Sequence, residues 1–170
     1  MLTRRNQPYR KRIPYGMMNF ENVIKDDCYY VDKTPFIEDV EVSNKFFFFI
    51  RPRRFGKSLT LSMLQNYYDI NKKDRFEELF GKLYIGSHPT PERGSYLILR
   101  LNFSVVAAGL DDYQRGLDSY CAIEFYGFCT RYKKYLLEGA TERIMACKGA
   151  IDQLIAICRE CTDAGRQAYL

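Results

Sequence analysis

The sequence lacks the features that would point to a membrane or to an export route. Its longest apolar run, Phe46 to Ile50, is far shorter than the ~20 residues that a transmembrane helix needs. The basic N-terminus is not followed by the apolar segment of a secretory signal. The sequence therefore predicts no membrane partner, a cytoplasmic location by default, and reduced thiols for the six cysteines.

Histidine is nearly absent, since His88 is the only one. Cys158 and Cys161 have the C-x-x-C spacing of some zinc sites, but tetrahedral zinc needs two more ligands. His88 lies between Ser87 and Pro89 in a turn-rich segment, without a Ser or Cys partner pattern that would mark it as catalytic. We therefore interpret the two cysteines as small apolar residues on a helix.

Acidic residues are missing from the first twenty positions, which contain five basic ones. Because the other 21 basic residues equal the 21 acidic ones in number, this segment alone accounts for the net charge of +5. Residues 1–12 predict a flexible basic lead, either a solvated arm or a non-specific contact for nucleic-acid phosphates. With 46% hydrophobic residues in a chain of 170, residues 13–170 are expected to form one domain.

Two apolar segments, 45–50 and 96–103, predict core strands. The first is apolar enough to be buried on both faces of a parallel sheet. Helical patterns lie before, between and after these strands, at 19–25, from Pro35 with Thr34 as its N-cap, from Lys57 to about Ile70, at 75–79, from Tyr113 to Leu136, and from Ile151 to Cys161. Strands that alternate with helices indicate an α/β fold with a helical C-terminal third.

A basic turn after the first strand ends in Gly56-Lys57-Ser58, where a helical pattern begins. Strand, turn, Gly-Lys-Ser and helix follow in the order of a phosphate-binding loop. Glycine permits the tight turn, free amides at the helix start face an anion, and the serine hydroxyl can ligate Mg²⁺. The full pattern would have a first glycine at position 51, which here is Arg51. These residues alone leave two interpretations open, a nucleotide site and a basic turn that caps a helix.

Several blocks resemble those of a known family, namely Ile13-Pro14-Tyr15-Gly16, Tyr30-Val31-Asp32-Lys33-Thr34, Arg51 to Ser58, Tyr68-Asp69-Ile70, residues 76–86 and Asn102-Phe103-Ser104. From about Ile13 to its last residue, the chain resembles the bacterial predicted AAA-ATPase-like family. Longer members of that family carry a C-terminal PD-(D/E)XK nuclease-like domain. In the family, Arg-Pro-Arg-Arg-Phe-Gly-Lys-Ser is the usual phosphate loop, so Arg51 no longer counts against the nucleotide site.

The resemblance implies a P-loop ATPase-type domain that binds ATP and Mg²⁺. By motif match, Gly56 would shape the turn, Lys57 would contact the β- and γ-phosphates, and Ser58 would hold Mg²⁺. The expected nucleotide-binding residues are Arg53, Arg54, Phe55, Gly56, Lys57, Ser58 and Leu59. The arginines, including Arg51, would pair with phosphates or with acidic groups of a neighbouring element. The Tyr30–Thr34 block would lie near the base or ribose.

Hydrolysis also needs an acidic residue at the end of a neighbouring strand. In the family an apolar strand ending in Asp-Glu supplies it, and Gln167 to Leu170 resemble only the start of that strand. We therefore expect residues 13–170 to be the N-terminal part of the domain, truncated before the Walker B strand, with an incomplete parallel sheet and unassigned catalytic residues. In this class of sheet the acid-bearing strand lies beside the loop strand, so we expect an open edge and poor folding in isolation.

Two alternatives to an ATP-binding domain remain at this point. One is a nucleic-acid-binding or defence-related interaction module that uses the Arg-rich loop, and the other is an inactive remnant. Nucleic acid could also be a partner of the full-length protein. The sequence implies no oligomeric state and does not identify what ATP turnover would drive.

Overall fold

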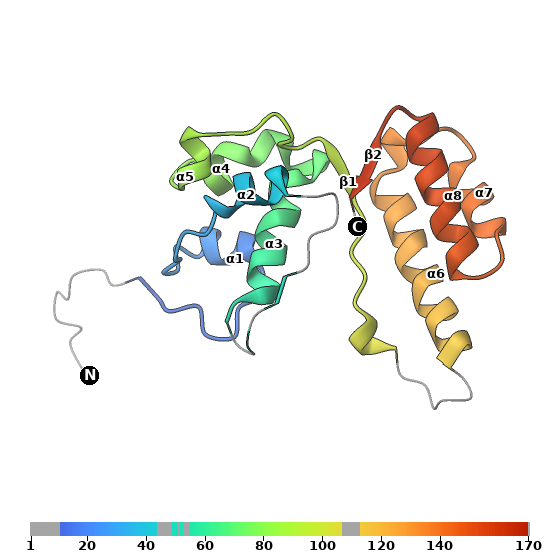
Figure 1. Ribbon diagram of the computed structural model, residues 1–170, viewed down its shortest axis with the longest axis horizontal. Coiled ribbons are helices and arrows are strands. Elements are labelled where there is room, and N and C mark those ends of the chain that lie inside the picture. Colours follow the sequence, from blue (N-terminus) through green and yellow to red (C-terminus); the bar gives the residue numbers. More distant parts are fainter. Residues whose placement is uncertain (1–10, 44–48, 51, 53–54, 107–112, 170) are drawn as a thin grey trace, which may run out of the picture. The chain divides into compact units, whose positions relative to one another are not determined.

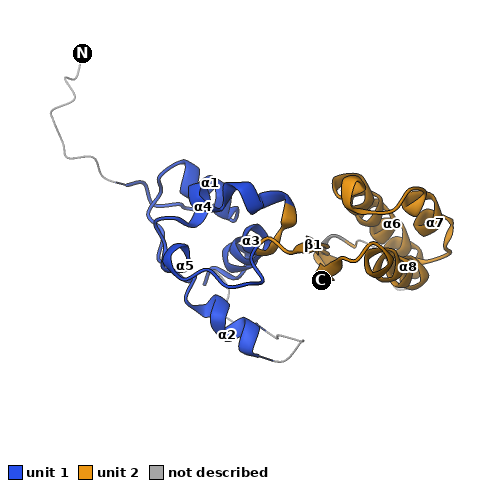
Figure 2. Ribbon diagram, turned by 90° about the horizontal axis from the view of Figure 1, so that it is seen from above, with its two compact units in different colours: residues 1–67, 71–93 blue, residues 68–70, 94–170 orange. Residues whose placement is uncertain are grey.

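A computed structural model of the chain describes residues 11–43, 49–50, 52, 55–106 and 113–169. The chain folds into two compact units, which are coloured separately in Figure 2. Unit 1 comprises Met1–Tyr67 and Asn71–Arg93, and unit 2 comprises Tyr68–Ile70 and Gly94–Leu170. Among the described residues, no helix is both long enough and apolar enough to cross a membrane.

Unit 1 is built from short helices (Figure 1), which pack around aromatic side chains. Its elements are α1 (Phe20–Lys25), α2 (Phe36–Val42), α3 (Lys57–Tyr68, whose last residue belongs to unit 2), the 3₁₀ helix η1 (Ile70–Arg75, which starts in unit 2), α4 (Phe76–Phe80) and α5 (Tyr84–Ser87). Phe80 stacks on Phe20 with ring centroids 5.0 Å apart and meets the Tyr67 ring edge-on at 5.5 Å. All three side chains are buried, so α1, α3 and α4 share one core.

Unit 2 combines a helical bundle with a small sheet. Its remaining elements are β1 (Tyr96–Ile98), η2 (Phe103–Val105), α6 (Tyr113–Arg131), η4 (Lys133–Tyr135), α7 (Ala140–Ala146), α8 (Ala150–Asp163) and β2 (Gln167–Tyr169). The apolar stripes of α6, α7 and α8 meet in a core that includes Phe125, Phe128, Ile144 and Ile157. Leu97 of β1 is buried in the same core, which attaches the sheet to the helices.

The two strands of unit 2 run parallel. Tyr96 pairs with Gln167, Leu97 with Ala168, and Ile98 with Tyr169. The ladder continues by one bond, from the Leu99 amide to the Tyr169 carbonyl at 2.9 Å. A parallel pair joined through helices is the connection expected of an α/β protein, so the α/β prediction is confirmed at this level.

The strand predictions are only partly confirmed. Residues 44–48, most of the predicted first strand, lie outside the described residues. Of the strand's last two residues, Phe49 and Ile50, neither is in a strand and Ile50 is 79% exposed, so the prediction is wrong at this end. The second strand, predicted over 96–103, is shorter in the structure, where Tyr96–Ile98 pair with Gln167–Tyr169.

The helix predictions are confirmed in position and corrected at their ends. α2 begins at Phe36, after Pro35, because the hydroxyl of Thr34 bonds elsewhere and does not cap this helix. The stripe predicted from Tyr113 to Leu136 ends as an α-helix at Arg131 and is followed by a tight 3₁₀ turn. A separate helix, α7, follows Gly139, whose φ of 74° is the left-handed conformation that glycine adopts readily.

Candidate functional site

The turn before α3 depends on the conformation of Gly56. Its φ is +76°, a region that residues with a side chain rarely adopt. Its carbonyl accepts the first helical bond of α3, from the Thr60 amide at 2.8 Å. Gly56 is therefore the last residue before the helix, and Lys57 is its first residue.

The first turn of α3 presents backbone amides and few competing groups. The opening amides of an α-helix, here those of Lys57, Ser58 and Leu59, have no acceptor within the helix and form its positive end. This turn contains no acidic residue that would neutralise that end. All three residues are half-buried, whereas Phe55 before them is 62% exposed. The arrangement favours an anion at the start of α3.

The structure brings five of the seven predicted nucleotide-binding residues together, from Phe55 to Leu59. Arg53 and Arg54, the other two, lie outside the described residues, and so does Arg51. The described part of the loop therefore consists of the turn and the helix start.

The Tyr30–Thr34 block has a structural role in unit 1. Asp32 accepts hydrogen bonds at one carboxylate oxygen from the Thr34 amide (2.8 Å) and hydroxyl (2.7 Å). Its other oxygen accepts from the Tyr84 amide at 2.8 Å, and the Thr34 hydroxyl accepts from the Ile85 amide at 3.2 Å. These bonds satisfy two opening amides of α5. The two polar side chains of the block thus fix α5, a role that sequence reasoning missed.

The segment expected to begin the acid-bearing strand is β2. Gln167–Tyr169 form a strand, and its partner among the described residues is β1. The expected pairing with the loop strand involves residues 44–48, which the structure does not describe. Along the chain after β1, the residues from Leu99 to Asn102 contain no carboxylate.

Comparison with known protein families adds a finding for nearly the whole chain. A family described as "Predicted AAA-ATPase" matches residues 14–168. The chain belongs to this family. Membership supports nucleotide binding in general terms, and by itself it identifies neither the phosphate-contacting atoms nor a reaction.

A curated relative of this AAA-ATPase family member covers a smaller segment. A protein of Azotobacter chroococcum mcd 1, described as an uncharacterized protein in the vnfD 5′ region, is 42% identical over 64 residues. The aligned segment is 37% of this chain and 12% of that protein. No solved structure matches the chain.

A buried polar pair in the AAA-ATPase family member was not singled out from the sequence. Asp69, which directly follows α3, is 5% exposed and hydrogen-bonds the Tyr132 hydroxyl. That hydroxyl also accepts from the Ile98 amide at 3.1 Å. Burial, with the neighbouring Asp69 charge, raises the pKa of Tyr132 above its usual value. The signal was the Tyr68-Asp69-Ile70 block, in which a carboxylate stands between apolar residues.

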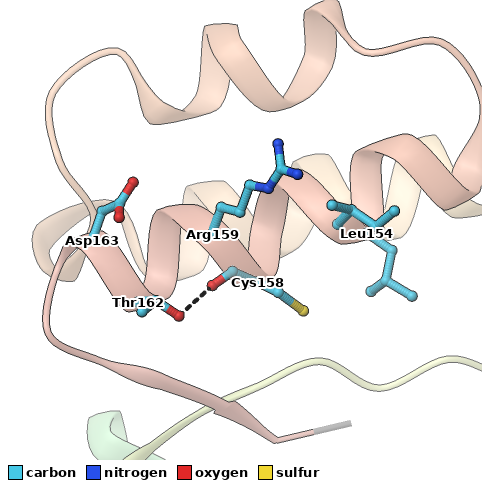
Figure 3. A pocket seen from close by; sticks show the side chains of 6 residues that line it. Leu154, Cys158, Arg159, Thr162 and Asp163 are labelled. Atoms are coloured by element: carbon cyan, nitrogen blue, oxygen red, sulfur yellow. Dashed lines mark hydrogen bonds between the residues drawn. The ribbon is translucent and has the colours of Figure 1, made fainter.

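A shallow pocket of about 430 Å³ lies on the surface of α8, lined by Leu154, Ile155, Cys158, Arg159, Thr162 and Asp163. Figure 3 shows the Thr162 hydroxyl donating to the Cys158 carbonyl at 2.9 Å, a bond within the helix. Cys158 is exposed, and burial raises the pKa of the Cys161 thiol to about 12. In the described part of the chain, no group of three or more His, Cys, Asp or Glu residues could hold a metal ion. The pocket therefore offers little polar chemistry for a nucleotide.

Proposed function

We propose that the chain binds a nucleoside triphosphate, with ATP as the expected ligand, through a variant Walker A loop that ends at the start of α3. The observation that carries the proposal is the left-handed Gly56 directly before a twelve-residue helix that opens with Lys57 and Ser58. Family membership supports the same ligand class. The proposal assigns phosphate contact to residues 53–59.

Each described residue of the loop has a physical reason for its proposed role. Gly56 lets the backbone turn so that the amides of Lys57, Ser58 and Leu59 converge on one anion. The helix dipole stabilises an anion at a helix N-terminus by about 0.3–1 kcal/mol. Because this contribution is small, the Lys57 ammonium would add a direct ionic contact to the phosphates. Among the described residues, no atom lies within 4 Å of the position where Gly56 would carry a Cβ, which leaves the backbone there accessible to a ligand on that side.

Magnesium fits this set of residues through Ser58. Mg²⁺ is held by one or two protein oxygens together with phosphate oxygens and water, and a hydroxyl in the first turn of α3 suits that mode. When bound, the ion would neutralise part of the phosphate charge. Arg53 and Arg54 would add guanidinium contacts to the phosphates.

We restrict the proposal to binding and expect little hydrolysis by these 170 residues. Phosphoryl transfer to water needs a carboxylate that positions Mg²⁺ and the attacking water. Neither β1 nor the described part of β2 contains one. Phosphate release from ATP should therefore stay near the rate of a protein-free control, as a colorimetric phosphate assay can measure. Release well above that rate, abolished by Lys57→Ala, would contradict this part of the proposal.

The binding test is titration calorimetry with ATP and Mg²⁺ on the wild type and on Lys57→Ala. We expect the substitution to weaken binding at least tenfold, because the phosphates lose their direct cation. The matched control is Lys82→Ala, an exposed lysine of the same unit, which should bind ATP as the wild type does. Ser58→Ala should bind ATP with a reduced dependence on Mg²⁺. Equal affinity in the wild type and Lys57→Ala would overturn the proposed site.

A further inference from the structure

Unit 2 carries a cluster of cations that the nucleotide loop does not include. We name it the η4 basic surface, and it consists of Arg131, Lys133, Lys134, Tyr135 and Arg166. The four cationic side chains are exposed, and Tyr135 is half-buried. The Nζ of Lys134 lies 4.7 Å from the centre of the Tyr135 ring, and the Cζ of Arg166 lies 5.5 Å from the same point. Both distances are within the range of cation–π attraction.

The fold itself brings these charges together from two distant segments. Tyr132 is fully buried, and its carbonyl accepts from the Tyr135 amide at 2.8 Å, which closes the η4 turn. Arg166 follows α7 and α8 in the sequence. Its backbone amide donates a hydrogen bond to the Cys161 carbonyl at 2.8 Å, which fixes the position of its backbone. The surface is therefore a product of the tertiary structure as well as a run of basic residues.

Few acidic residues lie close to this surface along the chain. Among the described residues, none of the ion pairs involves Lys133, Lys134 or Arg166, and residues 125–137 contain no acid. The nearest acids along the chain are Glu138 and Asp163. Closely spaced cations repel one another, so a multivalent anion would gain by neutralising several of them at once.

We propose that the η4 basic surface binds the phosphate backbone of a nucleic acid, without reading its bases. A phosphodiester chain carries closely spaced single charges, and each phosphate contact by Lys or Arg releases condensed counterions. Arginine and tyrosine beside the charges also suit nucleic acid, because guanidinium and aromatic planes stack on exposed bases. An acidic peptide would use the charges alone. This surface lies outside residues 53–59, so its function does not depend on the proposed nucleotide site.

The test compares two double charge reversals by fluorescence anisotropy with a labelled 20-nucleotide single strand. Lys133→Glu with Lys134→Glu reverses two charges of the surface, whereas Lys148→Glu with Arg159→Glu reverses two exposed charges elsewhere in unit 2. Both proteins keep the basic segment 1–12 and have the same net charge. We expect the first pair to weaken binding at least tenfold in 100 mM KCl and the control pair to change it less than threefold. The salt slope of log affinity should fall by about 1.4 for the first pair, as expected for two lost contacts to a single strand.

Three results would overturn the proposal. The first is that both pairs of substitutions weaken oligonucleotide binding equally. The second is that the wild type does not bind the oligonucleotide in 50 mM KCl. The third is that poly-glutamate displaces the labelled strand as effectively as unlabelled oligonucleotide does at equal charge. If circular dichroism shows that the reversed pair is unfolded, Lys133→Gln with Lys134→Gln serves instead, with the same expected change in slope. Lys57→Ala should leave oligonucleotide binding unchanged, which separates this surface from the nucleotide site.

Discussion

At the scale of single residues, Glu21 of unit 1 has three cationic partners. Its oxygens lie 2.8 Å from the Nζ of Lys25, 2.7 Å from the Nζ of Lys72 and 2.7 Å from a terminal nitrogen of Arg75. Hydrogen bonds from Lys25, Lys72 and Arg75 lower the pKa of Glu21 to about 2. Because its side chain is only 17% exposed, solvent screens these contacts less than it screens an ordinary surface pair.

Glu21→Gln should lower the free energy of unfolding near pH 7 by about 1–3 kcal/mol, since three cations lose a charged acceptor. Because the pKa of Glu21 is lower in the folded than in the unfolded protein, its charge stabilises the fold at any pH above the unfolded-state pKa. That stabilisation is lost as the pH falls towards the folded-state pKa. The stability gap between wild type and variant should therefore be full above about pH 5 and shrink between pH 4.5 and pH 2. Urea unfolding at pH 7, 4 and 3 measures the gap.

The control for this prediction is Glu77→Gln, an exposed carboxylate of α4 outside the Glu21 cluster. It should change the unfolding midpoint by less than half as much. A gap between wild type and Glu21→Gln that stays constant down to pH 3 would show that the charge of Glu21 does not carry the effect.

At the scale of elements, α5 is too short to hold itself in place. A helix of four residues has no amide-to-carbonyl ladder of useful length, so external acceptors decide whether it forms. Asp32 and Thr34 supply them, and the Thr34 side chain is fully buried. The hydrogen bond between Asp32 and the Tyr84 amide joins residues about fifty positions apart. The formation of α5 therefore depends on the tertiary structure of unit 1.

Asp32→Ala should destabilise unit 1 by about 1 kcal/mol, the usual cost of losing a helix N-cap, and should speed amide exchange at Tyr84 and Ile85 first. Hydrogen exchange followed by mass spectrometry or NMR can resolve this segment. Asp74→Ala, an exposed carboxylate of η1, is the matched control and should leave exchange in α5 unchanged. Equal protection of α5 in Asp32→Ala and wild type would argue against the capping role.

The same elements show what local sequence signals could predict. Apolar spacing located α3 and α4, because the burial of Met63, Tyr67 and Leu79 follows the helical period. It also located α8 but not its buried face, since Ile151 and Ile155 are exposed while Ile157 is buried. The end of α6 was missed, because it depends on the burial of Tyr132 rather than on a glycine or proline. Strand length was overestimated for a similar reason, since an apolar run does not show how many residues its partner strand offers.

The candidate site was predictable in its local part only. Gly56-Lys57-Ser58 indicated a turn followed by a helix, and the structure confirms both features. The Asp69–Tyr132 pair could not be found in this way, because its members are 63 positions apart and meet only after unit 2 has folded. Contacts of this kind depend on tertiary packing, which residue spacing within one element does not record.

At the scale of the whole molecule, the chain consists of two units with their own cores. Unit 2 relies on the Tyr132 hydroxyl, which is hydrogen-bonded by both Asp69 and the Ile98 amide. Tyr132→Phe leaves those two buried groups without this partner, which should cost about 1–3 kcal/mol. Substitutions in separate cores are expected to act additively, because they share no partners.

We therefore expect Tyr132→Phe to speed amide exchange in peptides of β1, α6 and α8 by roughly tenfold, the factor that corresponds to about 1.4 kcal/mol of opening free energy. Peptides of α1 and α4 should exchange as in the wild type, while Glu21→Gln should produce the reverse pattern. The double variant should show both changes at their single-variant sizes. If either substitution speeds exchange by the same factor in both sets of peptides, the two units unfold as one cooperative structure. Destabilisation of either unit would then extend through α3 to the start of the proposed nucleotide site.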